Sequence, residues 1–526
     1  MIDTLESVPA VLTRTAYGDL EGRLESGIAV FRGVPYVEPP VGELRWRSPR
    51  PPRPWTGLRR AAVFSARFVQ SADTGSAEDA LYANVWSPDV GGRAPVLVYM
   101  HGGGWQVGAG SVPIFDGARL AAVGGLVVVN FNYRLSGFGW GMHEALADPD
   151  TGHCANWGLQ DQVALLDWVR ENIEAFGGDP RNITLCGTSA GGATAWLLAL
   201  RARTHGIKRL ITISAPHTGA PATALRPEDS RRVYESIAEE FGGGGGVAGL
   251  REVPYRAFHD AWLRVFAGDP AAGGRLVPSG REYRGPVLDG DTVTGYAHQA
   301  PVLEVPVMSI CNATEGAFFT DPLSPSFPPA PPTPADEAEL VRAVRGVLGK
   351  LVPDPAAGLA EQCVAAYRAA AEDEGLPADP RTLWTEVWGD ALFRHPMLRL
   401  AERHEREGAT PGYVMQFAHP TRPPHFGTPH DATSKFLFGT HGHPLNAAQF
   451  GDGPAERQVS RLFMEYVASF ARGGVPRAAG APAWPPFTPS GPSTLILGGP
   501  ETARIGDVPK RAALRFWDRA EFVAMP

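Results

Sequence analysis

The chain has 526 residues, of which 44% are hydrophobic and 20% charged, an ordinary globular composition with enough apolar residues for a large core. The formal net charge of -8 offers no electrostatic argument for nucleic-acid binding, and no apolar run is long enough to span a bilayer. Residues 1–17 carry charged side chains and no apolar core, so we expect no signal peptide. Four cysteines in a chain of this length do not make a disulfide framework, so we expect buried free thiols and a cytoplasmic protein.

The first part of the chain predicts β-strands. Residues 11–34 alternate apolar and polar side chains between glycines, which is typical of short strands joined by tight turns. Residues 81–86 alternate in the same way. Residues 96–100 and 126–130 are instead continuous apolar runs, typical of central strands that are covered on both faces.

Helices and strands then alternate. Apolar side chains at helical spacing predict a helix over residues 161–176, ended by the Gly and Pro residues at 177–180. A strand at 183–186, a helix at 193–200 and a strand at 210–214 follow. This alternation predicts a mostly parallel, doubly wound sheet.

The remaining chain combines irregular segments with further elements. Five consecutive glycines at 242–246 predict a loop tip, and the Pro-rich segment 320–334 excludes regular structure, which leaves open whether it is a mobile flap or a linker. Strands are predicted at 305–310 and 493–497, and helices at 335–351, 355–373 and 457–472.

A Gly-x-Ser-x-Gly pattern lies between the strand predicted at 183–186 and the helix that follows it. It comprises Gly187, Thr188, Ser189, Ala190 and Gly191. In such a nucleophile elbow the glycines leave room for a turn that holds the serine strained and exposed. The positive end of the following helix faces any oxyanion formed at that serine. Taken alone, the pattern is more often a chance turn of Gly and Ser residues than a catalytic motif.

A second glycine motif follows the strand predicted at 96–100, in the sequence His101-Gly102-Gly103-Gly104. The bare N–H groups of Gly103 and Gly104, together with that of Ala190, would make an oxyanion hole. Since both motifs follow buried strands in the expected order, they predict nucleophilic catalysis by Ser189, which requires neither a metal nor a cofactor.

Several long segments are similar to the type-B carboxylesterase family, which includes bacterial para-nitrobenzyl esterases and, more distantly, cholinesterases. The resemblance implies one α/β-hydrolase catalytic domain over residues 1–526, with a small N-terminal strand region and a large, mostly parallel sheet covered by helices on both faces. The segments that carry the resemblance, besides the two glycine motifs, are Phe31-Arg32-Gly33-Val34-Pro35-Tyr36, Glu78-Asp79-Ala80-Leu81-Tyr82, Asn132-Tyr133-Arg134-Leu135, Asn156-Trp157-Gly158-Leu159-Gln160-Asp161-Gln162, Phe176-Gly177-Gly178-Asp179-Pro180 and Pro286-Val287-Leu288-Asp289-Gly290-Asp291.

The resemblance also implies the acid and the base. Glu315, in Asn312-Ala313-Thr314-Glu315-Gly316, matches the family's acid, which would hold the histidine in one tautomer. Counting back from Phe436-Leu437-Phe438-Gly439 selects His430 among fourteen histidines, with His425 as the second candidate. The order Ser189, Glu315, His430 is that of α/β-hydrolases.

Departures from the family pattern narrow the expected chemistry. Asp431 stands where glycine is usual in the family, and Thr433 stands where the family often has glutamate. Thr188 replaces the glutamate that usually precedes the serine, and the missing charge argues against cationic, choline-like substrates. Phe68 and Ala80 occupy the positions of a cysteine pair, so the loop between them is not linked by a disulfide.

We therefore predict a serine carboxylesterase that hydrolyses neutral, small-molecule esters through an acyl-enzyme on Ser189. Trp105, Phe318 and Phe319 are candidates for an aromatic pocket wall, although each is equally compatible with ordinary core packing. An amidase, thioesterase or acyltransferase would use the same site, and a non-catalytic binding module on the same fold is the alternative from a different class. The oligomeric state, monomer or small homo-oligomer, stays open.

Overall fold

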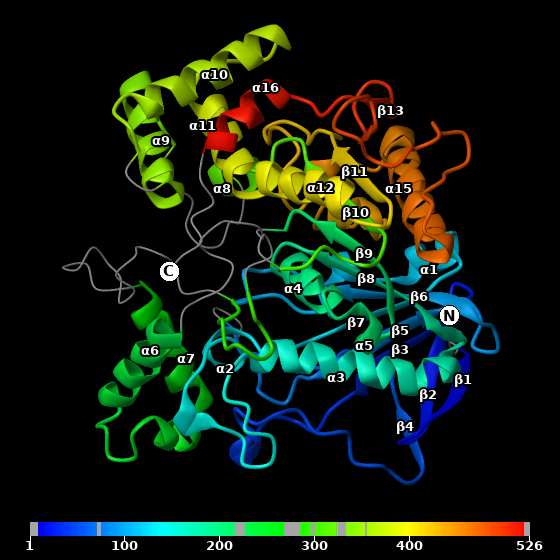
Figure 1. Ribbon diagram of the computed structural model, residues 1–526. Helices are drawn as coiled ribbons and strands as arrows, with labels where there is room; N and C mark the ends of the chain where they lie inside the picture. Colours follow the sequence, from blue (N-terminus) through cyan, green and yellow to red (C-terminus); the bar gives the residue numbers. More distant parts are fainter. Residues whose placement is uncertain are drawn as a thin grey trace, which may run out of the picture.

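The computed structural model describes residues 9–70, 75–215, 227–267, 285–295, 300–321, 323, 333–352 and 355–519. Within these ranges the strands form one 13-stranded sheet in the order β1-β2-β3-β5-β7-β6-β8-β9-β10-β11-β12-β13, with β4 paired to β2 (Figure 1). The strands are β1 Ala10–Thr15, β2 Gly18–Glu25, β3 Ile28–Pro35, β4 Leu58–Arg60, β5 Tyr82–Ser87, β6 Ala94–Met100, β7 Val127–Phe131, β8 Gly178–Thr188, β9 Ile207–Ile213, β10 Val307–Asn312, β11 Gly412–Phe417, β12 Thr494–Leu497 and β13 Ala503–Gly506.

The centre of the sheet is parallel. Strands β7, β6, β8, β9, β10, β11 and β12 run in one direction, with Val98 beside Leu185 and Leu185 beside Leu210. The N-terminal strands β1, β2, β3 and β5 add an antiparallel edge, and β13 adds an antiparallel strand at the other end. The predicted doubly wound sheet and the small N-terminal strand region are confirmed.

Helices cover both faces of the sheet because successive strand side chains point to opposite sides. Val96 and Val98 of β6 belong to the core beneath α3 and α4, whereas Leu97 and Tyr99 belong to the core beneath α1, α13 and α15. The α-helices are α1 Ala118–Gly124, α2 Ser136–Gly139, α3 Trp157–Asn172, α4 Ala190–Ala199, α5 Ala202–His205, α6 Pro227–Glu240, α7 Tyr255–Ala267, α8 Ala317–Thr320, α9 Glu337–Leu351, α10 Leu359–Asp373, α11 Pro380–Gly389, α12 His395–Glu407, α13 Ala432–Leu437, α14 Ala447–Phe450, α15 Pro454–Gly473 and α16 Arg511–Leu514.

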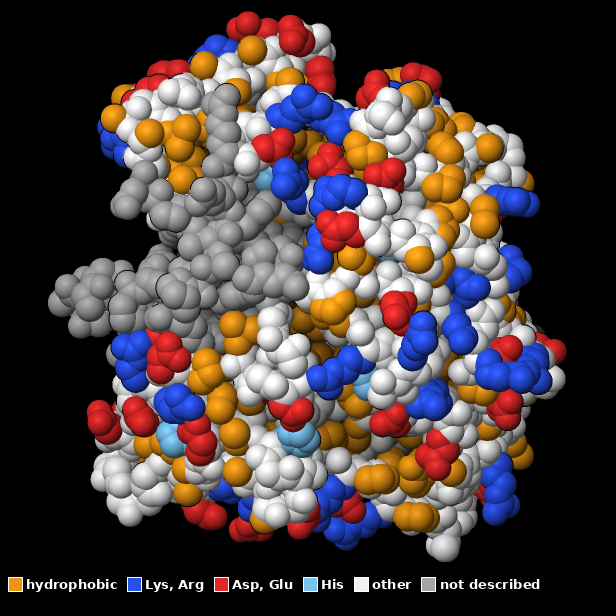
Figure 2. All heavy atoms as spheres, in the orientation of Figure 1, with side chains coloured by type: hydrophobic (Ala, Val, Ile, Leu, Met, Phe, Trp, Pro, Cys, Tyr) orange, Lys and Arg blue, Asp and Glu red, His pale blue; other side chains and the backbone are white. Residues whose placement is uncertain are grey.

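Two groups of helices project from the body on the same side of Figure 1. One comprises α9, α10, α11 and α16, which share an apolar cluster of their own, and the other comprises α6 and α7. On the face shown in Figure 2, acidic and basic side chains are interspersed over the coloured surface. Among the described helices, none combines the length and the apolar composition that a bilayer crossing requires.

Most predicted elements are confirmed, with shifts at their ends. The predicted strand at 183–186 begins earlier, at Gly178, so Asp179 and Pro180 belong to β8 instead of to a turn. The predicted helix at 161–176 is α3 followed by a 3₁₀ turn, Ile173–Phe176. The glycine segment 242–246 is an exposed turn, as predicted. Most of the Pro-rich segment 320–334 lies outside the described residues, and a single domain over 1–526 stays a prediction.

Candidate active site

Ser189 forms the sharp turn between β8 and α4. Its backbone angles, φ 55° and ψ -128°, lie in a region that side-chain-bearing residues rarely adopt, so the turn is strained. The strain is held from both sides: the Ser189 N–H donates to the carbonyl of Ile213 at 2.8 Å, and its carbonyl accepts from the N–H of Ala193 at 3.0 Å. Ser189 is half-buried and stands at the N-terminus of α4, where the positive end of the helix dipole lies.

Two glycines make this turn sterically possible. A Cβ atom on Gly187 would lie 2.4 Å from the carbonyl oxygen of Gly191, and one on Gly191 would lie 2.2 Å from that of Met100. Both neighbours are backbone atoms that cannot rotate away. The glycines are therefore required, because the elbow folds tightly on itself at Gly187 and packs directly against the end of β6 at Gly191, as the Gly-x-Ser-x-Gly pattern predicts.

The second glycine motif lies beside the elbow. A Cβ atom on Gly102 would come within 2.9 Å of the Cβ of Ser189, and Gly103 and Gly104 have φ of 117° and 59°. Among the described residues, the N–H groups of Gly103, Gly104 and Ala190 donate no hydrogen bond. The structure thus brings together a serine and free backbone donors, the combination that a developing oxyanion requires.

Glu315 and His430 form a buried hydrogen bond. Nδ1 of His430 lies 2.6 Å from Oε2 of Glu315, and their side chains are 6% and 0% exposed. Because an ionised carboxylate only accepts, the proton of this bond belongs to Nδ1, which leaves Nε2 as the basic nitrogen. Nε2 is buried and has no hydrogen-bond partner among the described residues, Ser189 included. The catalytic roles of the three residues stay predictions.

The other oxygen of Glu315 is also occupied. Oε1 accepts from the Ser214 hydroxyl and from the backbone N–H of Asn312, each at 2.6 Å. The Asn312 side chain in turn donates to the backbone carbonyl of His430 at 3.0 Å and so fixes the loop that carries the imidazole. The sequence did not identify Ser214 or Asn312 as supporting residues. Ser214 ends the strand predicted at 210–214, and Asn312 follows the strand predicted at 305–310.

His425, the second candidate base, has a different partner. Its Nδ1 lies 3.1 Å from Oδ2 of Asp321, which also faces Arg381 at 3.5 Å. The geometry therefore pairs Glu315 with His430 and assigns His425 to a separate charged cluster.

Aromatic rings surround the His430 imidazole. The ring centres of Phe319 and Phe318 lie 5.4 and 6.0 Å from it, and that of Phe393 lies 4.4 Å away. Phe393 was not predicted, because it belongs to a π-helical turn, Asp390–Arg394, that has no simple period in the sequence. Trp105 is buried against Trp140, with ring centres 6.2 Å apart. Whether these rings form the substrate pocket stays a prediction.

All four cysteines are free. Burial raises the pKa of the Cys186, Cys311 and Cys363 thiols, whereas Cys154 is half-buried. Phe68 and Ala80, at the positions of the family's cysteine pair, are buried in one apolar core. The predicted unlinked loop agrees with this arrangement, and the predicted burial of the thiols holds for Cys186, Cys311 and Cys363 but not for Cys154.

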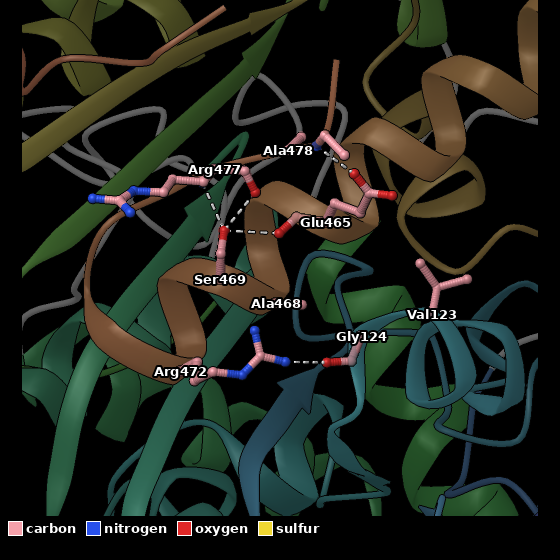
Figure 3. Close-up of a pocket in the computed structure, with 9 residues that line it drawn as sticks. Val123, Gly124, Glu465, Ala468, Ser469, Arg472, Arg477 and Ala478 are labelled. Atoms are coloured by element: carbon pink, nitrogen blue, oxygen red, sulfur yellow. Dashed lines mark hydrogen bonds between the residues drawn. The ribbon is translucent and has the colours of Figure 1, made fainter. Parts of the chain in front are cut away.

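A surface hollow of about 330 Å³ lies between the end of α1 and the C-terminal half of α15 (Figure 3). Arg472 crosses it to donate to the carbonyl of Gly124 at 2.9 Å, and Ser469 bonds to the backbone of Arg477. Its lining contains none of the site residues. Gly124 precedes β7, whereas Ser189 follows the end of β8. The hollow therefore lies at the amino ends of the parallel strands, opposite the carboxyl ends where Ser189 stands.

Several known esterases and hydrolases are similar to this chain. The para-nitrobenzyl esterase of Bacillus subtilis is 41% identical over 228 residues, which cover 41% of this chain and 45% of that relative. The phenmedipham hydrolase of Pseudarthrobacter oxydans is 31% identical over 521 residues, covering 94% of this chain and 96% of the relative. The crystal structure of the Geobacillus stearothermophilus carboxylesterase EST55 at pH 6.2 superposes with a TM-score of 0.76 at 29% identity, over 96% of this chain and 99% of that chain.

The solved carboxylesterases share the α/β-hydrolase fold with this chain, in agreement with the predicted fold class. The model of the carboxylesterase family matches residues 8–517, nearly the whole length. The chain therefore belongs to the carboxylesterase family.

Proposed function

We propose that this protein is a serine carboxylesterase that cleaves neutral carboxylic esters through an acyl-enzyme on Ser189. The single observation that carries the proposal is the buried 2.6 Å bond between Glu315 and His430, which leaves Nε2 free as a base at the edge of the sheet where the strained Ser189 stands. Family membership supports the same reaction class.

The first half of the reaction forms the acyl-enzyme. His430 Nε2 takes the proton of Ser189 as the hydroxyl oxygen attacks the ester carbonyl. The carbonyl oxygen becomes an oxyanion, which the N–H groups of Gly103, Gly104 and Ala190 stabilise. Glu315 stabilises the imidazolium, which then gives its proton to the departing alcohol.

The second half repeats the chemistry with water. His430 takes a proton from the water that attacks the acyl carbonyl, and Ser189 leaves with a proton returned by the imidazolium. In both halves of the reaction Nε2 of His430 accepts the proton and returns it. The proposed reaction therefore needs no metal or cofactor.

A neutral ester suits the surroundings of the nucleophile. The residue before Ser189 is Thr188, whose hydroxyl bonds to other hydroxyls instead of supplying a negative charge. The relatives include a para-nitrobenzyl esterase and a phenmedipham hydrolase, and esters of comparable size are our proposed substrates. The free thiols support our proposal that the protein is cytoplasmic, and the net charge of -8 offers no electrostatic attraction for nucleic acid.

The Ser189→Ala variant tests the proposal. It should lose hydrolysis of short-chain p-nitrophenyl esters by at least about 10³-fold, because no nucleophile remains. A fluorophosphonate should label the native protein at Ser189, with fluoride as the leaving group, and should not label the variant. Ser490→Ala, on the exposed surface, is the matched control and should behave like the native protein. Retained turnover in Ser189→Ala, or labelling of another serine, would overturn the proposal.

A related acyl transfer would use the same site, so the ester preference needs its own measurement. Turnover of matched ester, thioester and amide substrates by one preparation should be fastest for the ester. A higher kcat/KM for the thioester or the amide would replace the esterase assignment, and failure of any fluorophosphonate labelling would favour a non-catalytic binding module.

A further inference from the structure

Three buried hydroxyl groups meet behind the nucleophile, on the face of the sheet opposite α4. The Tyr99 hydroxyl donates to Oγ1 of Thr188 at 3.0 Å and lies 3.2 Å from Oγ of Ser434, while Thr188 Oγ1 and Ser434 Oγ are 3.3 Å apart. The three residues are 0%, 5% and 2% exposed. We call this set the hydroxyl triangle.

The hydroxyl triangle can satisfy itself. Each hydroxyl has one donor and can accept, so three of them close a ring in which each donates once and accepts once. Burial raises the pKa of Tyr99, so the phenol keeps its proton and remains a donor. No charge and no water are needed to complete the ring, which suits a buried position beside a reacting serine.

The corners of the hydroxyl triangle belong to the three segments that supply the proposed chemistry. Tyr99 is in β6, which runs directly into the glycine motif of the oxyanion hole. Thr188 ends β8 and immediately precedes Ser189. Ser434 is in α13, which begins just after His430. The ring thus joins the oxyanion donors, the nucleophile and the base through side chains that do not face the substrate.

At Tyr99 the contacts of the hydroxyl group can be removed while the packing of the aromatic ring is kept. Its ring packs against Phe115 and Phe438, with centres 5.0 and 4.8 Å apart, and these contacts survive when the hydroxyl alone is removed. A phenylalanine at this position therefore keeps the core and loses only the link between the three segments.

We propose that Tyr99, Thr188 and Ser434 are positioning residues that set the distance from Ser189 Oγ to His430 Nε2 and to the oxyanion donors. This inference rests on the proposed function. It assigns the geometry of the catalytic groups to a hydrogen-bonded ring of uncharged side chains.

The variants Tyr99→Phe, Thr188→Val and Ser434→Ala each remove one hydroxyl at nearly constant shape. Because small displacements of reacting groups are costly, we expect kcat for a p-nitrophenyl ester to fall roughly 10- to 100-fold, with KM changed less than about twofold. Thr188→Ser keeps the hydroxyl and should restore most of the rate that Thr188→Val loses. The double variant Tyr99→Phe/Ser434→Ala should be no slower than about twice the worse single variant, since one ring is broken in each case.

Tyr466→Phe is the matched control. Tyr466 is buried in the same core, and its hydroxyl donates to the carbonyl of Pro482 at 2.8 Å, remote from Ser189. It should lose thermal stability as Tyr99→Phe does, yet keep the native kcat. Equal kcat in native protein and Tyr99→Phe, or equal losses in Tyr99→Phe and Tyr466→Phe, would overturn the positioning role.

The rate of fluorophosphonate labelling separates the two proposals. If native Ser189 is labelled and Tyr99→Phe is labelled at least about tenfold more slowly, both stand. If native Ser189 is labelled and all ring variants match it, only the positioning role fails. If native Ser189 is not labelled, the proposed esterase function fails first, and the positioning role fails with it.

Discussion

Glu315 makes three hydrogen bonds of 2.6 Å, and they predict the cost of replacing it. One oxygen accepts from Ser214 and the Asn312 backbone, and the other faces Nδ1 of His430. In Glu315→Gln the amide can keep the first two bonds, but its NH₂ then meets Nδ1 and stabilises the tautomer whose Nε2 carries the proton. That histidine cannot act as a base, so kcat should fall about 10⁴-fold with little change in folding.

Steady-state kinetics on a p-nitrophenyl ester, with the melting temperature as a folding check, measures this effect. Ser214→Ala is the control, since it removes one supporting bond and keeps the tautomer; its kcat should fall by no more than about tenfold. If Glu315→Gln kept a kcat within a factor of ten of the native value, Glu315 would not be the orienting acid.

At the residue scale, the sequence identifies the motifs better than it identifies their partners. Ser189 and its glycines follow from two glycine motifs that each come after a buried strand, because the turn imposes a steric requirement that the sequence reflects. The family resemblance selected His430 ahead of His425, whereas the contact between the His430 imidazole and Glu315 is seen only in the fold. Thr188 meets Tyr99 and Ser434 from 89 and 246 positions away, which no local pattern can report.

The contact between α4 and the end of β6 gives a prediction at the scale of the elements. In Gly191→Ala the new Cβ would stand 2.2 Å from the carbonyl oxygen of Met100, so α4 must move off the sheet or the strand must shift. Overpacking against rigid backbone costs about 1–3 kcal/mol or more, and the elbow is distorted as well. We expect a lower melting temperature and loss of ester hydrolysis.

The control for this substitution lies on the exposed face of a helix. A Cβ atom on Gly346 of α9 would have no neighbouring atom within 4 Å outside its own stretch of helix, so Gly346→Ala meets no clash. It should stabilise the fold by about 0.5–1 kcal/mol through helix propensity. Equal melting temperatures and equal activities for the two alanine variants would contradict the steric account of the elbow.

Helices and strands were predictable where burial requires a simple pattern of apolar residues in the sequence. The apolar runs of β6 and β7 and the helical spacing of α3 mark core faces directly. The start of β8 was missed because Gly178 and Pro180 usually end regular structure, yet here they belong to a strand that pairs with β6 only at Ala94 before its register shifts. The helices α6, α7, α11 and α12 were not predicted, and α11 is joined to α12 by the π-helical turn.

At the scale of the whole molecule, Ser189 stands at the carboxyl end of the parallel strands, and the fold buries several histidines in other parts of the chain. Burial lowers the pKa of His404, His419 and His441, and lowers those of His101 and His259 to about 4. Stability therefore couples to pH through residues far from the elbow as well as near it.

The direction in which stability changes with pH follows from which state, folded or unfolded, binds more protons. An unfolded histidine takes up a proton near pH 6.5, whereas these buried ones resist it, so between about pH 6.5 and 4.5 the unfolded state holds more protons. The stability these groups contribute is complete above that window and is lost as the pH falls through it. Carboxylates whose pKa is lowered in the native protein, such as Glu25 and Glu144, add a loss of their own below about pH 5, so the histidine contribution has to be measured as a difference between variants.

His441 allows this coupling to be measured at one position. Its side chain is 0% exposed, Nδ1 donates to the carbonyl of Gly451 at 3.0 Å, and the ring stacks on Phe436. In His441→Gln the amide can still donate to Gly451 but cannot become charged. The variant should melt at a lower temperature than the native protein at neutral pH, because the stacking is lost, yet its melting temperature should decline less steeply between about pH 6.5 and 4.5. Differential scanning calorimetry at half-unit pH steps gives both slopes; parallel curves for the two proteins would show that His441 takes no part in the loss of stability at acid pH.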